Sequence, residues 1–174
     1  YQAGIAVVIT LSAVYAQLVM KFTTAQTITL ILVVNITAAI GAFVFGYVQD
    51  RLGHKKTLAL TILLWIIMGV MAAFSHGPVS FWIAANIAGI AMGSSQSAGR
   101  AVVAVFAPAG ELAQFYSAWN VAVWGANVLG PITYGTVTWL TSGDQRTAIL
   151  VTTLFFVIGL LILRRVHLPS KTVC

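Results

Sequence analysis

The sequence predicts an all-α integral membrane protein folded as a bundle of six transmembrane helices. The chain has 174 residues, of which 60% are hydrophobic and 7% are charged, whereas soluble domains carry about 25% charged residues. Its apolar runs are separated by short breaks rich in turn residues or charges. Because each crossing of a bilayer core takes about 20 apolar residues, six helices and their turns account for the whole length.

The first three predicted helices cover residues 4–20, 27–47 and 57–74. Each is a membrane-length apolar run that ends where charged or turn-forming residues begin. Lys21 opens the first break, and the polar run 49–56 separates the second helix from the third. Boundaries of this kind are accurate to a few residues.

The last three predicted helices cover residues 79–97, 112–140 and 146–163. Glycine, proline or charged residues lie in the breaks between them. The polar stretch 164–174 is predicted to be a cytoplasmic tail.

The basic residues predict how the bundle is oriented in the membrane. Alternate loops share one side, and one side collects seven cations against two, Lys21 and Arg146, on the other; the seven are Arg51, Lys55, Lys56, Arg100, Arg164, Arg165 and Lys171. Cytoplasmic loops carry the excess of Lys and Arg, so we expect both termini in the cytoplasm. The net charge of +6 therefore reports topology, and we expect no nucleic-acid partner. The short loops favour a bacterial inner membrane.

The chain opens at Tyr1 inside an apolar run, without an initiator methionine or a basic leader. We therefore expect it to be a fragment of a longer protein. The single cysteine, Cys174, is terminal and cannot form an internal disulfide.

A charge-rich corner follows the second predicted helix, with the spacing G-x-x-x-D-R-x-G-x-K-K; its residues are Gly46, Asp50, Arg51, Gly53, Lys55 and Lys56. A partly buried carboxylate needs a partner, and we expect Arg100 to pair with Asp50. Glu111 and the start of the fifth helix, which favours negative charge, are the other candidates. We expect the corner residues, Arg100 and Glu111 to form a conformational latch. Alternatively, Lys55 and Lys56 only anchor the helices to lipid headgroups.

The fourth predicted helix carries Asn86, Gly89, Gly93 and Gln96, followed by Arg100. Gly89 and Gly93 form a G-x-x-x-G pair, which allows close helix contact in lipid. Two interpretations remain open for the polar residues of this helix: packing with hydroxyl bonds to the backbone, or the wall of a water-filled cavity.

The fifth predicted helix places Asn120, Trp124, Asn127 and Pro131 on one face. Amides in a membrane helix point towards protein or water, and Gly130 with Pro131 permits a bend. These residues indicate either a cavity wall or a structural kink with amide bonds between helices.

Tyr15 and Asn35, on the first two helices, are additional candidates for the cavity. No Asp, Glu, Lys or His lies near the middle of a predicted helix, so no proton-coupling group is expected there. The histidines lie outside the helices and lack partners at metal-ligand spacing. We therefore expect no metal and no cofactor.

The helix count, the inside termini and the corner motif resemble one half of a major facilitator superfamily (MFS) transporter. Residues 95–100, 106–110, 115–116 and 129–135 resemble the C-terminal half of its vacuole-effluxer-like, autophagy-related branch. Gln114 departs from the glutamate usual there. The resemblance implies that this chain supplies helices seven to twelve of a twelve-helix parent.

The function implied is transport of a small solute by alternating access, with the lipid bilayer and an N-terminal six-helix half as partners. A free-standing six-helix protein, acting as a homodimeric scaffold or channel, is the alternative. An enzyme is not expected, because no later helix carries the histidine that a rhomboid-like serine protease needs.

Overall fold

A computed structural model describes residues 1–108 and 110–166 of the chain. These residues form six α-helices, and no strand occurs among them, which confirms the all-α fold class. The helices are α1 (Gln2–Leu18), α2 (Thr24–Leu52), α3 (His54–Ala73), α4 (Pro78–Phe106), α5 (Leu112–Leu140) and α6 (Gln145–Arg165).

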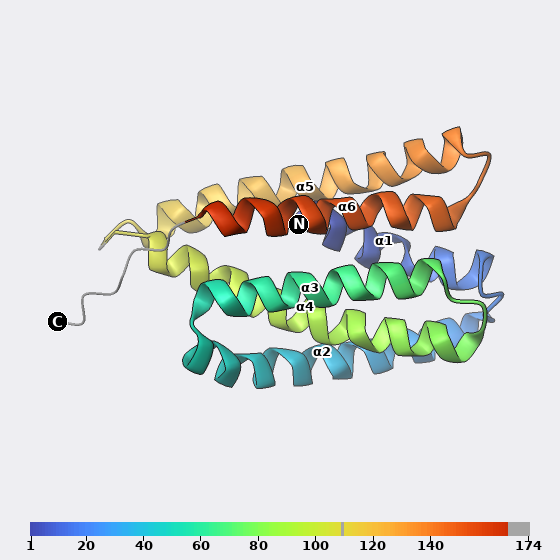
Figure 1. Cartoon of the computed structure of the whole chain (residues 1–174), viewed down its shortest axis with the longest axis horizontal. Coiled ribbons are helices and arrows are strands. Elements are labelled where there is room, and N and C mark those ends of the chain that lie inside the picture. Colours follow the sequence, from blue (N-terminus) through green and yellow to red (C-terminus); the bar gives the residue numbers. More distant parts are fainter. Residues whose placement is uncertain (109, 167–174) are drawn as a thin grey trace.

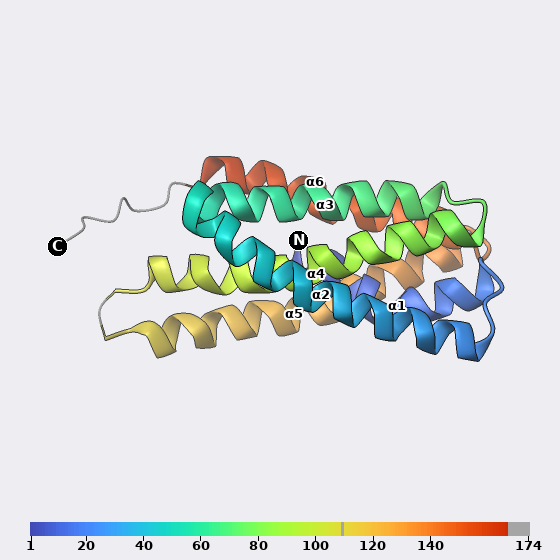
Figure 2. The same cartoon turned by 90° about the horizontal axis from the view of Figure 1, so that it is seen from below.

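The helices lie roughly parallel to one long axis and alternate in direction (Figure 1). Helix α4 packs against α2 and α3, α3 also packs against α6, and α1 packs against α5. Figure 2 shows α3 and α6 along one side of the bundle and α5 along the opposite side. Tyr1 lies midway along the bundle, so α1 runs from its middle to one end.

The eight basic residues of the described chain divide unequally between the two ends of the bundle. One end carries the α2–α3 corner, the end of α4 and the end of α6, and we call it the basic end; its cations are Arg51, Lys55, Lys56, Arg100, Arg164 and Arg165. The opposite end carries Lys21 and Arg146. The predicted tail residues 167–174 lie outside the described part of the chain.

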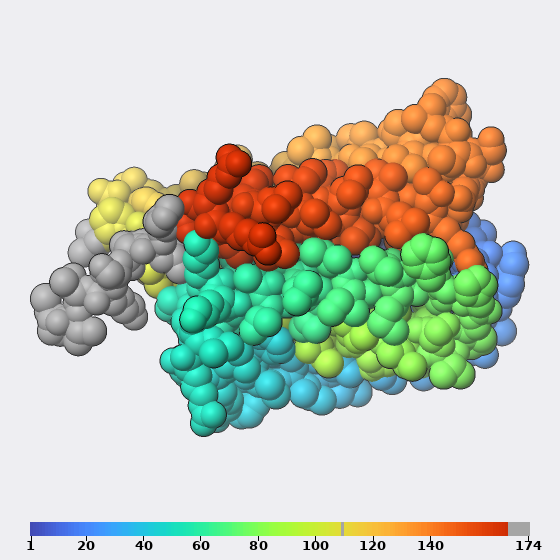
Figure 3. All heavy atoms as spheres, in the orientation of Figure 1, coloured from blue at the N-terminus to red at the C-terminus, as the bar shows by residue number. Residues whose placement is uncertain are grey.

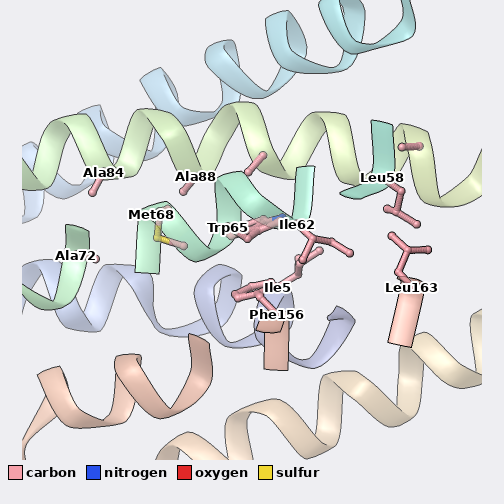
Figure 4. Close-up of a cluster of buried hydrophobic side chains, with 12 residues drawn as sticks. Ile5, Leu58, Ile62, Trp65, Met68, Ala72, Ala84, Ala88, Phe156 and Leu163 are labelled. Carbon is pink, nitrogen blue, oxygen red and sulfur yellow. The ribbon is translucent and has the colours of Figure 1, made fainter. Parts of the chain in front are cut away.

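The main core lies where α1, α3, α4 and α6 meet (Figure 4). Trp65 is fully buried and stacks on Phe156, with ring centroids 5.2 Å apart. Its indole N–H donates to Ser95 Oγ at 3.2 Å. Buried Trp normally needs such a partner, so one bond joins α3 to the polar run of α4.

Three helices, α2, α3 and α6, are individually long and apolar enough to cross a membrane. Helix α1 is apolar but has 17 residues. Helices α4 and α5 have 29 residues each, as α2 does. At 1.5 Å per residue, a helix of that length is about 43 Å long, enough to cross the hydrocarbon core and reach both interfaces.

The helix bounds differ from the predicted ones most at the basic end. Helix α2 continues through Asp50 to Leu52, and α4 continues through Gly99 to Phe106. Gly99 does not end α4, because it is buried where a Cβ would meet the Tyr1 hydroxyl at 2.7 Å and the Trp119 ring at 3.3 Å. A glycine used for close packing gives the same sequence signal as one that ends a helix.

Candidate functional site

The α2–α3 corner turns at a single residue, Gly53. Its φ of +80° is a conformation that side-chain-bearing residues rarely adopt. The Gly53 N–H donates to Gln49 O at 2.9 Å, and the Thr57 hydroxyl donates to Gly53 O at 3.0 Å. The Gln49 amide also contacts the ring of His54 across the turn. The two helix ends therefore meet with only one residue between them.

Lys55 connects this corner to the end of α6. Its Nζ donates to the carbonyl oxygens of Arg164 at 3.0 Å and Val166 at 2.6 Å. The C-terminus of a helix carries partial negative charge and unpaired carbonyl groups. Lys55 thus caps the C-terminus of α6 from the start of α3, although Lys55 and Arg164 are more than a hundred positions apart in the sequence.

Asp50 and Arg51 lie in the last turn of α2, and both are exposed. Arg100 is exposed on α4, which packs directly on α2. The carbonyl oxygen of Arg100 accepts a hydrogen bond from the Tyr116 hydroxyl at 3.0 Å, which connects α4 to α5. All these groups belong to the basic end, and neither Asp50 nor Arg100 is buried against the bundle.

Glu111 and Lys56 complete the predicted latch set. Glu111 directly precedes α5 and is exposed, without a side-chain capping bond. Its carboxylate is close to the positive end of the α5 dipole. Lys56 is exposed in the first turn of α3. Gly46, on α2, has no atom of the described chain within 4 Å of a Cβ built on it.

A cavity of about 240 Å³ lies between α1, α2 and α4, towards the end opposite the basic end. Tyr15 and Asn35 line it, together with Ser12, Thr27 and Tyr134 as the other polar residues. The rest of the lining is apolar, and the lining as a whole includes residues from all six helices.

The polar groups of the cavity are largely satisfied within the chain. The Tyr15 hydroxyl donates to Ala72 O at 2.9 Å, and the Tyr134 hydroxyl donates to Gln145 Oε1 at 2.6 Å. Asn35 is exposed, and its Nδ2 donates to Ile31 O at 2.8 Å. That bond leaves the Asn35 carbonyl oxygen as an acceptor at the cavity's edge.

Asn86 and Gln96 do not line this cavity. Both are half-buried on α4, and the Asn86 amide donates to Trp82 O at 2.8 Å, one turn earlier. Side-chain bonds to the backbone of the same helix are a common way to satisfy a polar group locally.

Asn120, Trp124 and Asn127 lie on an exposed face of α5. Trp124 is 69% exposed. Pro131 lies within α5 and has no N–H, so the carbonyl oxygen of Asn127 lacks its helical donor. Near the middle of α5, two amide side chains therefore share one exposed face, close to a backbone carbonyl that lacks its usual helical donor.

Glycines allow two pairs of helices to approach closely. On α4, a Cβ at Gly89 would lie 2.6 Å from Val34 O, and one at Gly93 would collide with the carbonyl oxygen of Ala38. A third glycine, Gly41 on α2, faces Ile90 O at 2.5 Å. On α5, a Cβ at Gly130 would collide with the carbonyl oxygen of Ala3 on α1.

Sequence reasoning missed most of the cavity lining, including Ser12, Thr27, Phe81, Met92 and Tyr134. Nothing in the spacing of a single helix distinguishes these residues from ordinary packing residues. Only Tyr134 had a local signal, because it follows the Gly130–Pro131 step by one turn.

Comparison with known proteins agrees with this geometry. The family described as "Vacuole effluxer Atg22 like" matches residues 1–173. The "Uncharacterized MFS-type transporter YxiO" of Bacillus subtilis (strain 168) is 27% identical over 172 residues, which cover 99% of this chain and 39% of that protein. Among solved structures, the inward-open xylose transporter XylE from E. coli superposes with a TM-score of 0.77 at 19% identity. That match covers 97% of this chain and 44% of XylE.

The chain thus spans about two-fifths of the length of both proteins. Its helices have the fold of part of an MFS transporter. This chain belongs to the vacuole effluxer Atg22-like family of MFS-type membrane transporters.

Proposed function

We propose that this chain is the C-terminal six-helix half of a transporter that moves a small solute across a membrane by alternating access. The coverage of 39% of one relative and 44% of a solved transporter supports this proposal, because each leaves room for a second half of similar size. In such transporters two helical repeats rock about a site near the bilayer midplane.

The observation that carries the proposal is the exposed polar face of α5. Asn120 and Asn127 are exposed within a 29-residue helix of a membrane protein. Exposing amides to hydrocarbon is costly, and such residues face protein or a water-filled cavity. By contrast, the exposed positions of α3 after its first turn are all apolar. We therefore infer that α3 faces lipid and that α5 faces a solute pathway or the other half.

The cavity and the α5 face would form this half's share of the solute pathway. Tyr15 and Asn35 lie at the cavity between α1 and α2, while Asn120, Trp124 and Asn127 face outwards from α5. Asn86 and Gln96 are half-buried on α4, and Asn86 lies in the sequence between Ala85 and Ala88, which line the cavity. Gly130 and Pro131 would let α5 bend where α1 touches it.

The basic end would act as the latch that closes the pathway on that side. Asp50 and Arg51 on α2, Arg100 on α4 and Glu111 just before α5 are exposed there. Helix α4 contacts both α2 and α5. Exposed groups of opposite charge can pair in one state of a transporter and separate in the other. This end carries six cations and the opposite end two, which supports a cytoplasmic position for the basic end. We also propose that the membrane is a bacterial inner membrane.

Cysteine labelling tests whether the polar face of α5 is in contact with water, and it does not require knowledge of the substrate. Asn120→Cys and Asn127→Cys, each the only cysteine in the full-length protein, should react with a water-soluble maleimide in proteoliposomes. Leu63→Cys and Ile67→Cys, on the apolar face of α3, are matched controls that should not react, because thiolates do not form in lipid. Equal reactivity at all four positions would refute the proposal.

The latch has its own test. Asp50→Asn should slow solute exchange in proteoliposomes while protein yield and insertion stay unchanged. Normal exchange by this variant would remove Asp50 from the mechanism. A homodimer of this chain would also cover the α5 face, and cross-linking from Asn127→Cys to a second copy rather than to another segment of the same polypeptide would favour that alternative.

A further inference from the structure

The exposed side of α3 and α6 has a regular pattern that the proposed transport does not explain. On α3, the exposed positions follow one stripe from a cation into apolar residues: Lys56, Leu60, Leu63, Ile67 and Val70. On α6, the stripe Leu154, Ile158, Leu161 and Arg165 is exposed and ends in a cation. Spacings of three and four residues put each set on a single helix face.

The two stripes reach the same end of the bundle. Helices α3 and α6 pack against each other and run in opposite directions, and both appear on one face of the molecule (Figure 3). Leu58 and Leu163 belong to the same buried cluster near that end. The cation that starts one stripe and the cation that finishes the other therefore lie at the same membrane interface.

Lys55 connects the two helix ends that carry these cations. Its two hydrogen bonds go to the carbonyl oxygens of Arg164 and Val166, the residues on either side of Arg165. Lys56 is the next residue after Lys55 along α3. The bonds of Lys55 thereby fix the end of α6 beside the first turn of α3, while Lys56, Arg164 and Arg165 stay exposed.

Charge at this corner is strongly one-sided. The chain has only three acidic residues, and Asp144 lies at the opposite end while Glu111 directly precedes α5. Asp50, in the last turn of α2, is the one side-chain carboxylate beside this corner, where it is outnumbered by Lys55, Lys56, Arg164 and Arg165. Basic clusters beside a membrane helix attract anionic lipid headgroups, at roughly 1 kcal/mol for each cation.

We propose that the α3–α6 corner at the basic end is a binding site for an anionic phospholipid. The headgroup phosphate lies against Lys56 and Arg165, with Arg164 beside them, and the acyl chains lie along the two apolar stripes. The stripes specify lipid rather than a soluble phosphate, because each continues for more than two turns into the hydrocarbon region. This inference does not depend on the proposed transport function.

Native mass spectrometry of the delipidated full-length protein tests the site. The protein is titrated with phosphatidylglycerol or with phosphatidylcholine of the same acyl chains, and the affinity of the first bound lipid is compared. The wild type should prefer phosphatidylglycerol. The double variant Lys56→Gln/Arg165→Gln should bind it about 25-fold more weakly, or roughly fivefold for each cation removed, and should bind phosphatidylcholine as before.

Lys21→Gln is the matched control, because it removes one exposed cation from the opposite end. It should leave the preference unchanged, and circular dichroism should show that all variants keep their helices. A double variant that retains the preference, or a Lys21 variant that loses it equally, would overturn the proposal. Displacement of the lipid by millimolar glycerol phosphate would also overturn it, because the acyl chains would then contribute nothing.

Discussion

The glycine contact between α2 and α4 gives the sharpest stability prediction. A Cβ at Gly93 would collide with Ala38 O and would lie 2.7 Å from Ala38 C and 3.0 Å from Ala42 N. All three are backbone atoms, so no rotamer change on α2 can make room. For Gly93→Ala, the helices would have to separate by roughly 0.5–1 Å, which forfeits a quarter to a half of the dispersion attraction at the crossing.

The expected magnitude follows from two opposing effects. Overpacking of a tight core costs up to about 3 kcal/mol, and replacing glycine by alanine inside a helix returns about 1 kcal/mol. Gly93→Ala should therefore lower the free energy of unfolding by about 2 kcal/mol. Gly125→Ala is the matched control, since apart from its own neighbours and the local backbone of α5 no atom of the described chain lies within 4 Å of its Cβ position. It should raise the free energy by up to about 1 kcal/mol.

Reversible unfolding of the full-length protein in mixed detergent and sodium dodecyl sulfate measures both variants. The two should differ by about 3 kcal/mol, with Gly93→Ala the less stable. The reasoning is refuted if Gly93→Ala is as stable as Gly125→Ala, because the α2–α4 backbones would then have space that the structure denies them.

Four further outcomes follow from individual contacts. Trp65→Ala should cost about 3–5 kcal/mol of stability in the same unfolding assay, whereas Ser95→Ala, which removes only the partner of the indole N–H, should cost about 1–3 kcal/mol. Lys55→Met should uncap α6 and speed amide hydrogen exchange in its last turn, and Lys55→Arg should restore protection. Gly53→Ala should cost about 1–2 kcal/mol because of the φ of +80°, read as a lower melting temperature. Hydrogen bonds from the hydroxyl and N–H of Thr147, followed by the N–H of Arg146, lower the pKa of Asp144. The stability that Asp144 contributes is therefore complete above the ordinary carboxyl pKa and is lost as the pH falls through the depressed value. Asp144→Asn should reduce the fall in melting temperature that the wild type shows at acidic pH.

Much of the fold could be predicted because the solvent is lipid. Apolar length alone gives six helices, and the charge-rich run 49–56 marks a corner correctly. Its local shape could not be predicted, because only Gly53 breaks the helix while Asp50 and Lys55 stay within helical turns. The polar runs of α4 gave two interpretations, and the structure places Gly89 and Gly93 against α2. That distinction depends on which helix lies opposite, which one sequence does not contain.

The candidate site was less predictable than the fold. Asn35 and Asn86 are both asparagines within apolar helical runs, yet Asn35 lines the cavity and Asn86 does not. The cavity combines side chains from six helices, so its lining depends on packing between segments distant in sequence. The role of Lys55 was equally hidden, since its partners lie at the far end of the chain.

The uneven apolar character of the six helices bears on how the protein is made. Helices α2, α3 and α6 are long and apolar enough by length and composition to cross a membrane, whereas α4 and α5 do not meet that criterion of apolarity despite their length. Helix α4 directly follows the apolar helix α3, and α5 directly precedes the apolar helix α6, each across a short connection. We expect the helices to insert in pairs, with the more hydrophobic α3 and α6 promoting the insertion of their more polar neighbours α4 and α5 into the bilayer. Mutations that lower the hydrophobicity of α3 or α6 should then impair the integration of α4 or α5 before they disturb any finished contact.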